Sequence, residues 1–500
     1  MIAEITEKSL TDVVFEKTIE YMEGMPKEKR KGIGQFFTSP ETAKFMASLY
    51  SPPKKRELSV LDPGSGSGIL TAAVVERLQK EDVVKRINIT CYETCEDIIL
   101  VLKQNLEYIK KVSIVPVEYV IIQENYILHQ GADFNNSGLC ENSILQYDWI
   151  ICNPPYKKIS KNSAEAQLMK KVCFGTPNMY FLFSSMSLYN LDKEGEIVLI
   201  IPRSWTSGAY FKVFREYLLG RGTLKHIHLF TSRKKVFDKE NVAQETVIIK
   251  LDRSELKDTV TITTSESNSR FDNINVFKAP YTDIIVGYQK FVFLISCEED
   301  LGVVQNINKF TETLPSLGLK LKTGLIVDFR NMKYMSDKKT DEMVPVICSQ
   351  NVKDGKITFD EHTRFISKEK RTLIRNSKNV LILKRFTAKE EKRRLQCGVF
   401  LSSAFPEYTH ITTDNKVNFI EGIGFELTEE QAYGLYAIFN STTYDEYYRV
   451  LNGSTQVNST EMNSIPVPAM DKIESLGRTL LEKGDVSVQF CDKLLLNLIL

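Results

Sequence analysis

The chain reads Val60-Leu61-Asp62-Pro63-Gly64-Ser65-Gly66-Ser67-Gly68 where a short apolar strand runs into a glycine-rich loop. Glycines let a backbone pass close to a ligand, and the helix expected to follow offers free amide groups. The spacing differs from the G-x-G-x-x-G loop of dinucleotide-binding proteins. Because the carboxylate of Asp62 would repel a pyrophosphate, the loop favours a cationic or amine-bearing ligand. A tight turn with purely structural glycines is the alternative.

The sequence around this loop alternates apolar strands with helical segments. Strands that alternate with helices predict a Rossmann-like α/β domain with a mainly parallel sheet, whose ligands bind at the carboxyl ends of the strands. Glu93 follows one such strand, where a carboxylate can accept both hydroxyls of a ribose; a solvated acid is the alternative. The expected strands are 59–61, 87–92, 117–122, 149–152, 197–201, 224–230 and 245–251, with helices at 69–78 and 98–109.

A second motif, Asn153-Pro154-Pro155-Tyr156, follows the strand 149–152. Prolines lock the backbone and lack an N–H, so the carbonyl groups of Asn153 and Pro154 can point at a substrate. An aromatic amine such as N6 of adenine is a poor nucleophile because its lone pair is delocalised. Two acceptors, the Asn153 side-chain oxygen and the Pro154 carbonyl, can bind its hydrogens and favour the attacking geometry. Tyr156 supplies a ring on which an extruded base can stack.

Composition limits the classes of function. The 500 residues are 42% hydrophobic and suffice for two to three domains. The net charge of +1 means that a nucleic-acid partner would need a local basic patch. Neither a secretory signal nor a membrane-length apolar run is visible, so a cytoplasmic protein without membrane contact is expected. The nine cysteines lack paired ligand spacing, and no metal site is expected.

The second half of the chain differs in character from the first. We expect a helical lead-in over residues 1–31, a catalytic domain over 32–275 and an α+β DNA-binding domain over 276–500. Residues 364–394 hold twelve Lys and Arg against three Glu, a stripe suited to phosphates, with a solvated charged helix as the alternative. The expected DNA contacts are Lys384, Arg385, Arg393 and Arg394 from this stripe, and Asn452 and Gln456 from a polar loop.

Three motifs and their order along the chain resemble the gamma class of amino-methylating DNA methyltransferases. They are Gly34-Gln35-Phe36-Phe37-Thr38, the glycine loop and Asn153-Pro154-Pro155-Tyr156. Residues 321–330 and 451–458 resemble BsuBI/PstI-like modification methylases of Type II restriction–modification systems. The resemblance implies S-adenosyl-L-methionine as the methyl donor and N6 of adenine in double-stranded DNA as the acceptor. It also implies a short palindromic site of the CTGCAG kind, a cognate restriction endonuclease that acts separately, and a monomer from a bacterium or archaeon.

The same resemblance assigns residues to the cofactor and the target base. Asn125 stands where the family has an aspartate facing the cofactor adenine, and an asparagine oxygen can still accept from that amino group. Ser39 departs from the family's proline directly after the threonine. Phe237 resembles the second aromatic wall of the flipped base, with an ordinary loop hydrophobe as the alternative. The implied cofactor contacts are Phe36, Phe37, Thr38, Asp62, Gly64, Gly66, Gly68, Glu93 and Asn125.

Three rival functions fit parts of the pattern. An RNA or protein-glutamine N-methyltransferase is one, because Asn-Pro-Pro-Tyr also suits guanine and amide nitrogens; the long basic second half favours DNA instead. A non-catalytic DNA-binding protein is disfavoured by the intact motif. Asp354-Gly355-Lys356 has the D-x-K form of some nucleases, but its flanking residues predict a hairpin with an Asp-Gly turn, so endonuclease activity is not expected.

Overall fold

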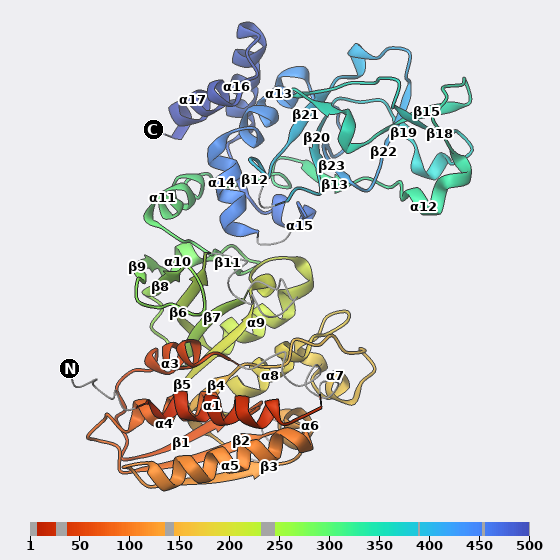
Figure 1. Cartoon of the computed structure of the whole chain (residues 1–500). Coiled ribbons are helices and arrows are strands. Elements are labelled where there is room, and N and C mark those ends of the chain that lie inside the picture. The colour runs from red at the N-terminus through yellow and green to blue at the C-terminus, as the bar shows by residue number, and fades with distance from the viewer. Residues whose placement is uncertain are drawn as a thin grey trace, which may run out of the picture. The chain divides into compact units, whose positions relative to one another are not determined.

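The structure is a computed structural model that describes residues 8–26, 38–135, 145–231, 246–388, 391–452 and 456–499. The chain divides into two compact units (Figure 1). The first comprises Met1–Trp205 and Tyr210–Lys290, and the second Thr206–Ala209 and Phe291–Leu500. This division comes after Lys290, whereas the sequence placed the boundary between the two functional domains at residues 275 and 276.

A nine-stranded sheet forms the centre of the first unit, in the order β3-β2-β1-β4-β5-β7-β6-β8-β9. The strands β3, β2, β1, β4 and β5 are parallel, and β7 runs antiparallel to both of its neighbours. The predicted α/β fold with a mainly parallel sheet is confirmed. The strands are β1 (Glu57–Asp62), β2 (Arg86–Tyr92), β3 (Val117–Ile122), β4 (Tyr147–Cys152), β5 (Leu191–Pro202), β6 (Thr223–Phe230), β7 (Thr246–Asp252), β8 (Thr259–Ser265) and β9 (Asn275–Pro280).

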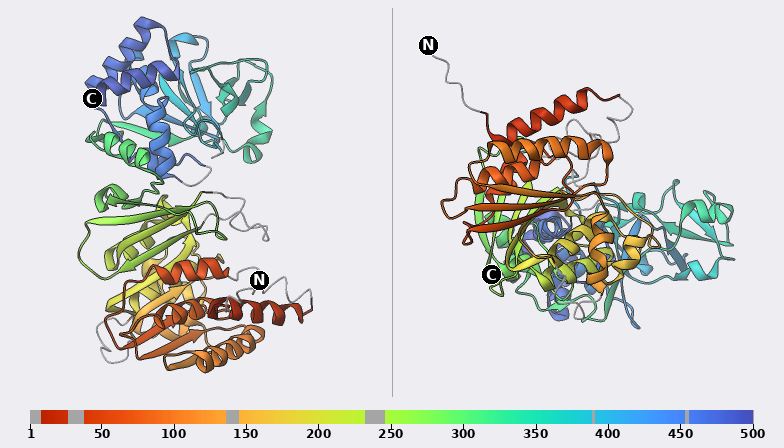
Figure 2. Two further views of the ribbon diagram at one scale, coloured as in Figure 1. Left: turned by 60° about the vertical axis from the view of Figure 1, so that its left-hand side comes forward. Right: turned by 90° about the horizontal axis from the view of Figure 1, so that it is seen from below.

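Helices cover both faces of this sheet. On one face α1 (Leu10–Glu23), α3 (Pro40–Ser48), α4 (Ile69–Leu78) and α5 (Glu96–Val112) pack together, with Val60 and Ile89 of the sheet in the same apolar core. The right-hand view of Figure 2 shows these red and orange helices on one side of the strands and yellow helices on the other. The second group is α6 (Tyr126–Asn135), α7 (Ala164–Leu168), α8 (Met179–Tyr189) and α9 (Lys212–Arg221).

Two of these helices follow directly from local sequence. Ser39 caps α3 by accepting a hydrogen bond from the Thr42 amide, and Pro40 occupies its first turn, as the sequence Ser39-Pro40 predicts. Every residue of α8 is buried, which is typical of a core helix that is apolar on all sides. Among the described residues, no helix has the length and apolar character needed to span a bilayer.

The second unit is an α+β structure, as expected. Its larger sheet has the order β13-β23-β20-β21-β17-β16 and its smaller sheet β14-β18-β15-β22-β19. The strands of the larger sheet are β13 (Leu319–Thr323), β16 (Val352–Lys353), β17 (Lys356–Ile357), β20 (Val380–Lys384), β21 (Cys397–Phe400) and β23 (Val417–Gly422). Those of the smaller sheet are β14 (Met335–Ser336), β15 (Met343–Ile347), β18 (Arg364–Ser367), β19 (Arg375–Asn376) and β22 (His410–Thr413).

The strands β16 and β17 form an antiparallel pair, and Asp354 and Gly355 between them both have positive φ. The predicted Asp-Gly hairpin is therefore confirmed. The helices of this unit are α11 (Glu298–Ile307), α12 (Asp328–Asn331), α13 (Glu429–Phe439), α14 (Thr442–Leu451), α15 (Ser459–Met462), α16 (Met470–Lys483) and α17 (Val488–Ile499).

Candidate active site

The candidate site lies where the strand order of the first unit reverses. β1 pairs with β2 on one side and with β4 on the other, so the loops that leave the carboxyl ends of β1 and β4 share a crevice. The glycine loop follows β1, and Asn153 to Tyr156 follow β4. A Cβ atom built on Gly64 would lie 3.9 Å from the carbonyl oxygen of Asn153. The two predicted motifs are therefore adjacent.

A cavity of about 600 Å³ connects these motifs, a size that suits a nucleoside-like ligand. The predicted residues on its wall are Gly64, Gly66, Glu93, Asn125, Asn153, Pro154, Pro155 and Tyr156. Sequence reasoning missed Pro63, Tyr92, Thr94, Cys95, Ile98, Glu124, Tyr126, Lys157, Met179 and Phe183. Most of the missed residues follow the ends of β1 to β4, and that position was the one signal that pointed to them.

Asp62 ends β1 and is fully buried beside the cavity residues Pro63 and Gly64. Its Oδ2 accepts a hydrogen bond from the Thr71 hydroxyl at 2.9 Å, whereas its Oδ1 is buried without a donor among the residues that the structure describes. Burial raises the pKa of this carboxyl to about 7, against the lowering effect of the Thr71 hydrogen bond. A buried acceptor without a donor is costly, and a cationic ligand group would satisfy it.

Glu93 ties the end of β2 to the glycine loop. Its Oε2 accepts from the Gly66 amide at 3.1 Å, and its Oε1 accepts from the Thr94 and Cys95 amides at 2.8 and 2.9 Å. A carboxylate has about four lone-pair sites and three of them are taken, so Oε2 can still accept from a ligand hydroxyl. Gly66 and Gly68 have φ of 53° and 86°, conformations that favour glycine.

Asn125 lines the cavity, but its side chain also caps α6. Its Oδ1 accepts from the amides of Ile127 and Leu128 at 3.0 and 3.3 Å, and its Nδ2 donates to Glu165 at 3.0 Å. Asparagine is a preferred residue at helix N-termini for this reason. The hydrogen bond between Asn125 and a cofactor adenine stays a prediction.

Two hydroxyl groups hold the amide of Asn153. Its Nδ2 donates to Oγ1 of Thr38 at 3.2 Å, and its Oδ1 accepts from the hydroxyl of Tyr156 at 2.8 Å. The same hydroxyl lies 2.9 Å from the carbonyl oxygen of Ile200 in β5. Since a tyrosine has one hydroxyl hydrogen, it can serve only one of these acceptors at a time. Phe36, Phe37 and Phe237 lie outside the described residues.

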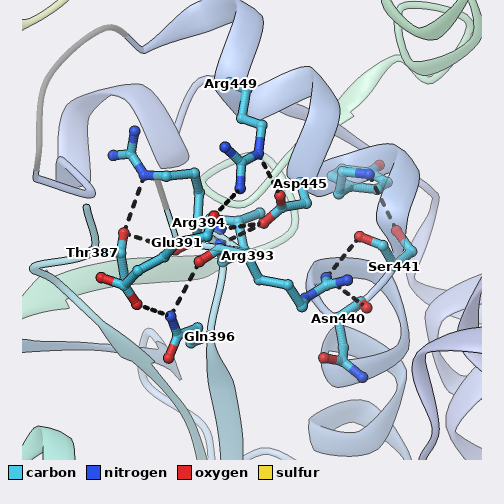
Figure 3. Close-up of polar contacts among 11 residues, drawn as sticks. Thr387, Glu391, Arg393, Arg394, Gln396, Asn440, Ser441, Asp445 and Arg449 are labelled. Carbon is cyan, nitrogen blue, oxygen red and sulfur yellow. Dashed lines mark hydrogen bonds and ion pairs between the residues drawn. The ribbon is translucent and has the colours of Figure 1, made fainter. Parts of the chain in front are cut away.

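The predicted DNA contacts in the second unit are of two kinds: some are bonded within the unit, and the others leave their side chains partly exposed. Arg393 and Arg394 belong to the loop between β20 and β21. Figure 3 shows this loop bonded to Asn440 and Ser441, which lie between α13 and α14, and to Asp445 of α14. The Arg393 guanidinium donates to the carbonyls of Asn440 and Ser441 at 2.7 and 3.0 Å. Asp445 accepts from the main-chain amide of Arg394 at 2.7 Å. These bonds join the loop to the helices.

The structure places Arg394 and Asn452 in the interior of the second unit, against the expectation that their side chains contact DNA. Arg394 is fully buried and its Nε donates to the Thr387 hydroxyl at 3.1 Å, so its guanidinium is not available to a phosphate in this structure. Asn452 is 1% exposed and donates to the hydroxyl of Tyr448 at 2.7 Å. Both side chains stabilise the interior of the second unit.

Lys384, Arg385 and Gln456 remain partly exposed. Arg385 donates to the carbonyl of Asn415 at 3.0 Å and to the side chain of Gln456 at 3.2 Å. The basic stripe is not one helix, because residues 364–388 form β18, β19, β20 and their connections. The alternative of a solvated charged helix is therefore wrong for that part, and contact of these three residues with DNA stays a prediction.

The doubly wound strand order and the cavity at its switch point define the first unit as a Rossmann-like α/β domain with a ligand-binding site. Residues 80–237 match the family model described as Eco57I restriction-modification methylase. The chain is 32% identical over 492 residues to Type II methyltransferase M.BsuBI of Bacillus subtilis, covering 94% of this chain and 95% of that protein. It is 30% identical over 462 residues to M.PstI of Providencia stuartii, covering 89% of each.

The chain belongs to the Type II methyltransferases of restriction–modification systems, and its methyl donor is S-adenosyl-L-methionine. The family that the sequence motifs resemble is thereby confirmed. Among solved structures, the Type ISP restriction-modification enzyme LlaBIII bound to DNA aligns with 96% of this chain and 41% of its own, at a TM-score of 0.48 and 11% identity.

Proposed function

We propose that this enzyme methylates N6 of adenine within a short sequence of double-stranded DNA and so protects that DNA from a cognate restriction endonuclease. The observation that carries the proposal is that Asn153 and Tyr156 line the same cavity as the glycine loop and Glu93. A motif suited to a planar amine thus lies beside a loop suited to an amine-bearing nucleoside. The CTGCAG-like recognition sequence is part of the proposal.

On the donor side, three residues would hold the cofactor. Asp62 would pair with its ammonium group, because the buried Oδ1 of Asp62 lacks a donor among the described residues. Glu93 would accept a hydrogen bond from the ribose through Oε2, and Asn125 would lie beside the adenine. Bound there, S-adenosyl-L-methionine supplies an electrophilic methyl group.

On the acceptor side, the oxygens of Asn153 and Pro154 would bind the two hydrogens of the target amine. Its nitrogen lone pair is then directed at the methyl group instead of the ring, and preorganised acceptors of this kind lower the barrier. The N–C bond forms as the S–C bond breaks, and the surplus proton on nitrogen leaves to water. No residue has to deprotonate the amine before it attacks.

Tyr156 would stack on the extruded base, and its hydroxyl adds a second role. In this structure the hydroxyl donates to Oδ1 of Asn153, the oxygen that the amine needs. The Ile200 carbonyl at 2.9 Å offers the hydroxyl another acceptor. When the amine arrives, the hydroxyl can therefore turn to Ile200 without losing a hydrogen bond.

The test is long-read sequencing of DNA from a host that lacks adenine methylation and expresses the enzyme. We expect N6-methyladenine at one short motif, and none when Asn153→Ala is expressed, since losing such an acceptor costs on the order of 10²–10³ in rate. Cofactor binding by Asn153→Ala should stay near the wild-type value. A modified cytosine would contradict the choice of base, and unmodified DNA from an active enzyme would contradict DNA as the substrate.

A further inference from the structure

Three large apolar side chains are exposed around α12 of the second unit. Phe329 is 73% exposed, Met332 70% and Leu325 57%; we call these three residues the α12 ridge. Phe329 lies in α12, and Met332 begins the 3-10 turn Met332–Tyr334 that continues it. Phe329 and Met332 are three residues apart, and both are exposed on this short segment. Single exposed apolar residues are common, but a group of them marks an interaction surface.

Cations lie against the aromatic rings of this segment. The Arg330 guanidinium is 5.4 Å from the ring centroid of Phe329. The ammonium groups of Lys333 and Lys370 lie 4.9 and 4.0 Å from the ring centroid of Tyr334. Hydrogen bonding to Lys333 and Lys370 lowers the pKa of the Tyr334 hydroxyl. The segment therefore combines exposed apolar surface with positive charge.

The carboxylate in this segment, that of Asp328, is already paired. Arg364 lies 2.8 Å from one of its oxygens and Lys416 lies 3.0 Å from the other. The Lys416 side chain is 53% exposed, so it can contact a further anion while it stays near Asp328. Asp414 is a second carboxylate near Lys416 and, after Asp328, also raises the pKa of its ammonium group. The positive charge of the segment therefore comes from Arg330, Lys333 and Lys370.

The ridge is joined to residues that the sequence predicts as DNA contacts. The Asn415 amide donates to the carbonyl of Ile326 at 2.8 Å, and the Asn415 carbonyl accepts from Arg385 at 3.0 Å. Arg385 in turn donates to Gln456. Phe386, which is 47% exposed, pairs with Gln456 through an isolated β-bridge. A chain of hydrogen bonds thus links the segment that carries the ridge to Arg385 and Gln456.

We propose that the α12 ridge is a DNA-contacting wedge, with Phe329 and Met332 packed against bases and sugars while Arg330, Lys333, Lys370 and Lys416 neutralise the phosphates beside them. Proteins that deform DNA insert apolar side chains of this kind at base steps. A site for phosphates alone would not require exposed apolar groups. Lysine is depleted in protein–protein interfaces, so the lysines around the ridge favour DNA over a protein partner.

The wedge rests on the proposed function, because it assumes that DNA is the substrate. The test measures binding of the full-length enzyme to two short labelled duplexes. One contains the unmodified sequence that the enzyme methylates, and the other contains the same bases in shuffled order. We expect Phe329→Ala to weaken binding to the site at least about five-fold, the lower end of what an aromatic contact to a base contributes. Met332→Ala, which removes an aliphatic contact, should weaken it by a smaller factor. The salt dependence of binding should not change in these variants. It should become shallower by roughly two in Lys333→Ala/Lys370→Ala, close to one unit for each phosphate that is no longer neutralised.

Ile423→Ala is the matched control, because Ile423 is an apolar side chain of the second unit that is 56% exposed and lies outside the ridge. Its DNA binding should equal that of the wild type. Wild-type binding by Phe329→Ala and Met332→Ala would overturn the wedge and leave the proposed function intact. A wild-type dimer in sedimentation that Phe329→Ala converts to a monomer would instead show that the ridge contacts a second copy. Failure of the proposed function would appear in a different experiment: long-read sequencing would find no methylated site in DNA from a host that expresses the wild-type enzyme.

Discussion

The side chain of Tyr156 offers a ring for stacking and a hydroxyl for hydrogen bonding, and the two should contribute unequally. Tyr156→Ala loses the stacking, worth about 1–3 kcal/mol per base, and should raise KM for DNA by one to two orders of magnitude. Tyr156→Phe keeps the ring but loses the bond to Asn153, a neutral hydrogen bond worth about 0.5–1.5 kcal/mol, while Thr38 still holds the other end of that amide. We therefore expect Tyr156→Phe to stay within about ten-fold of wild-type kcat. Steady-state kinetics of both variants checks this, and equal losses would give the hydroxyl a larger role.

Asp62 should make cofactor binding depend on pH. Burial raises the pKa of its carboxyl to about 7, so below that pH the group is neutral in the free protein and cannot pair with an ammonium. Above that pH it is a carboxylate and can pair. The Kd for S-adenosyl-L-methionine should therefore fall as pH rises through about 7 and then level off.

Calorimetry of cofactor binding across this range is the measurement, with Asp62→Asn as the control. The asparagine cannot ionise, so the variant should bind more weakly and retain only the pH dependence that comes from the ligand itself. Identical pH profiles for the wild type and Asp62→Asn would remove Asp62 from cofactor binding.

At the scale of elements, the loop between β20 and β21 depends on α14. Asp445 accepts from the buried amides of Arg394 and Leu395 at 2.7 Å each, and from the Arg449 side chain at 2.8 Å (Figure 3). Asp445→Ala leaves two buried donors unpaired, at about 1–3 kcal/mol each. We expect the free energy of unfolding of the second unit to fall by about 2–6 kcal/mol.

Chemical denaturation measures this loss of stability. Asp445→Asn keeps an oxygen acceptor and should recover part of the stability. The exposed Asp471→Ala should cost at most about 1 kcal/mol, which is what an acid in the first turn of a helix contributes. If Asp445→Ala unfolded like the wild type, the bonds in Figure 3 would not determine the stability of the loop.

The elements of the catalytic half could be predicted because their signals are local. The helix expected at residues 69–78 coincides with α4, and the strand expected at 117–122 with β3, since each is a periodic apolar run. The basic stripe could not be interpreted locally. Arg394 is buried through contacts with Asp445 and the Tyr448 ring, which lie far along the sequence and give no sign in the stripe itself. The capping role of Asn125 could have been predicted from the sequence, because an asparagine directly before an apolar helix is typical of an N-cap.

At the scale of the whole molecule, a chain with a net charge of +1 has no general attraction for DNA, so affinity must come from local cations. Lys384 and Arg385 are predicted contacts of the stripe that the structure leaves partly exposed. Arg393 is partly exposed too, but its guanidinium binds two carbonyls within the second unit. Reversing both to glutamate should weaken binding to all sequences alike, since phosphate contacts carry no sequence information. The salt slope should become shallower by about two, because each phosphate that a cation neutralises adds about one unit to it.

The control for this reversal is Lys54→Glu/Arg56→Glu, which changes the net charge equally at exposed positions of the first unit. If the local surface matters and the total charge does not, only the first pair of substitutions lowers the affinity and the salt slope. Cofactor affinity should stay constant in both, because none of the four substituted residues lines the cavity. A DNA titration at several salt concentrations decides the matter. Equal losses of affinity in the two double variants would mean that the field of the whole chain governs binding, and an unchanged slope in both would move the DNA surface away from Lys384 and Arg385.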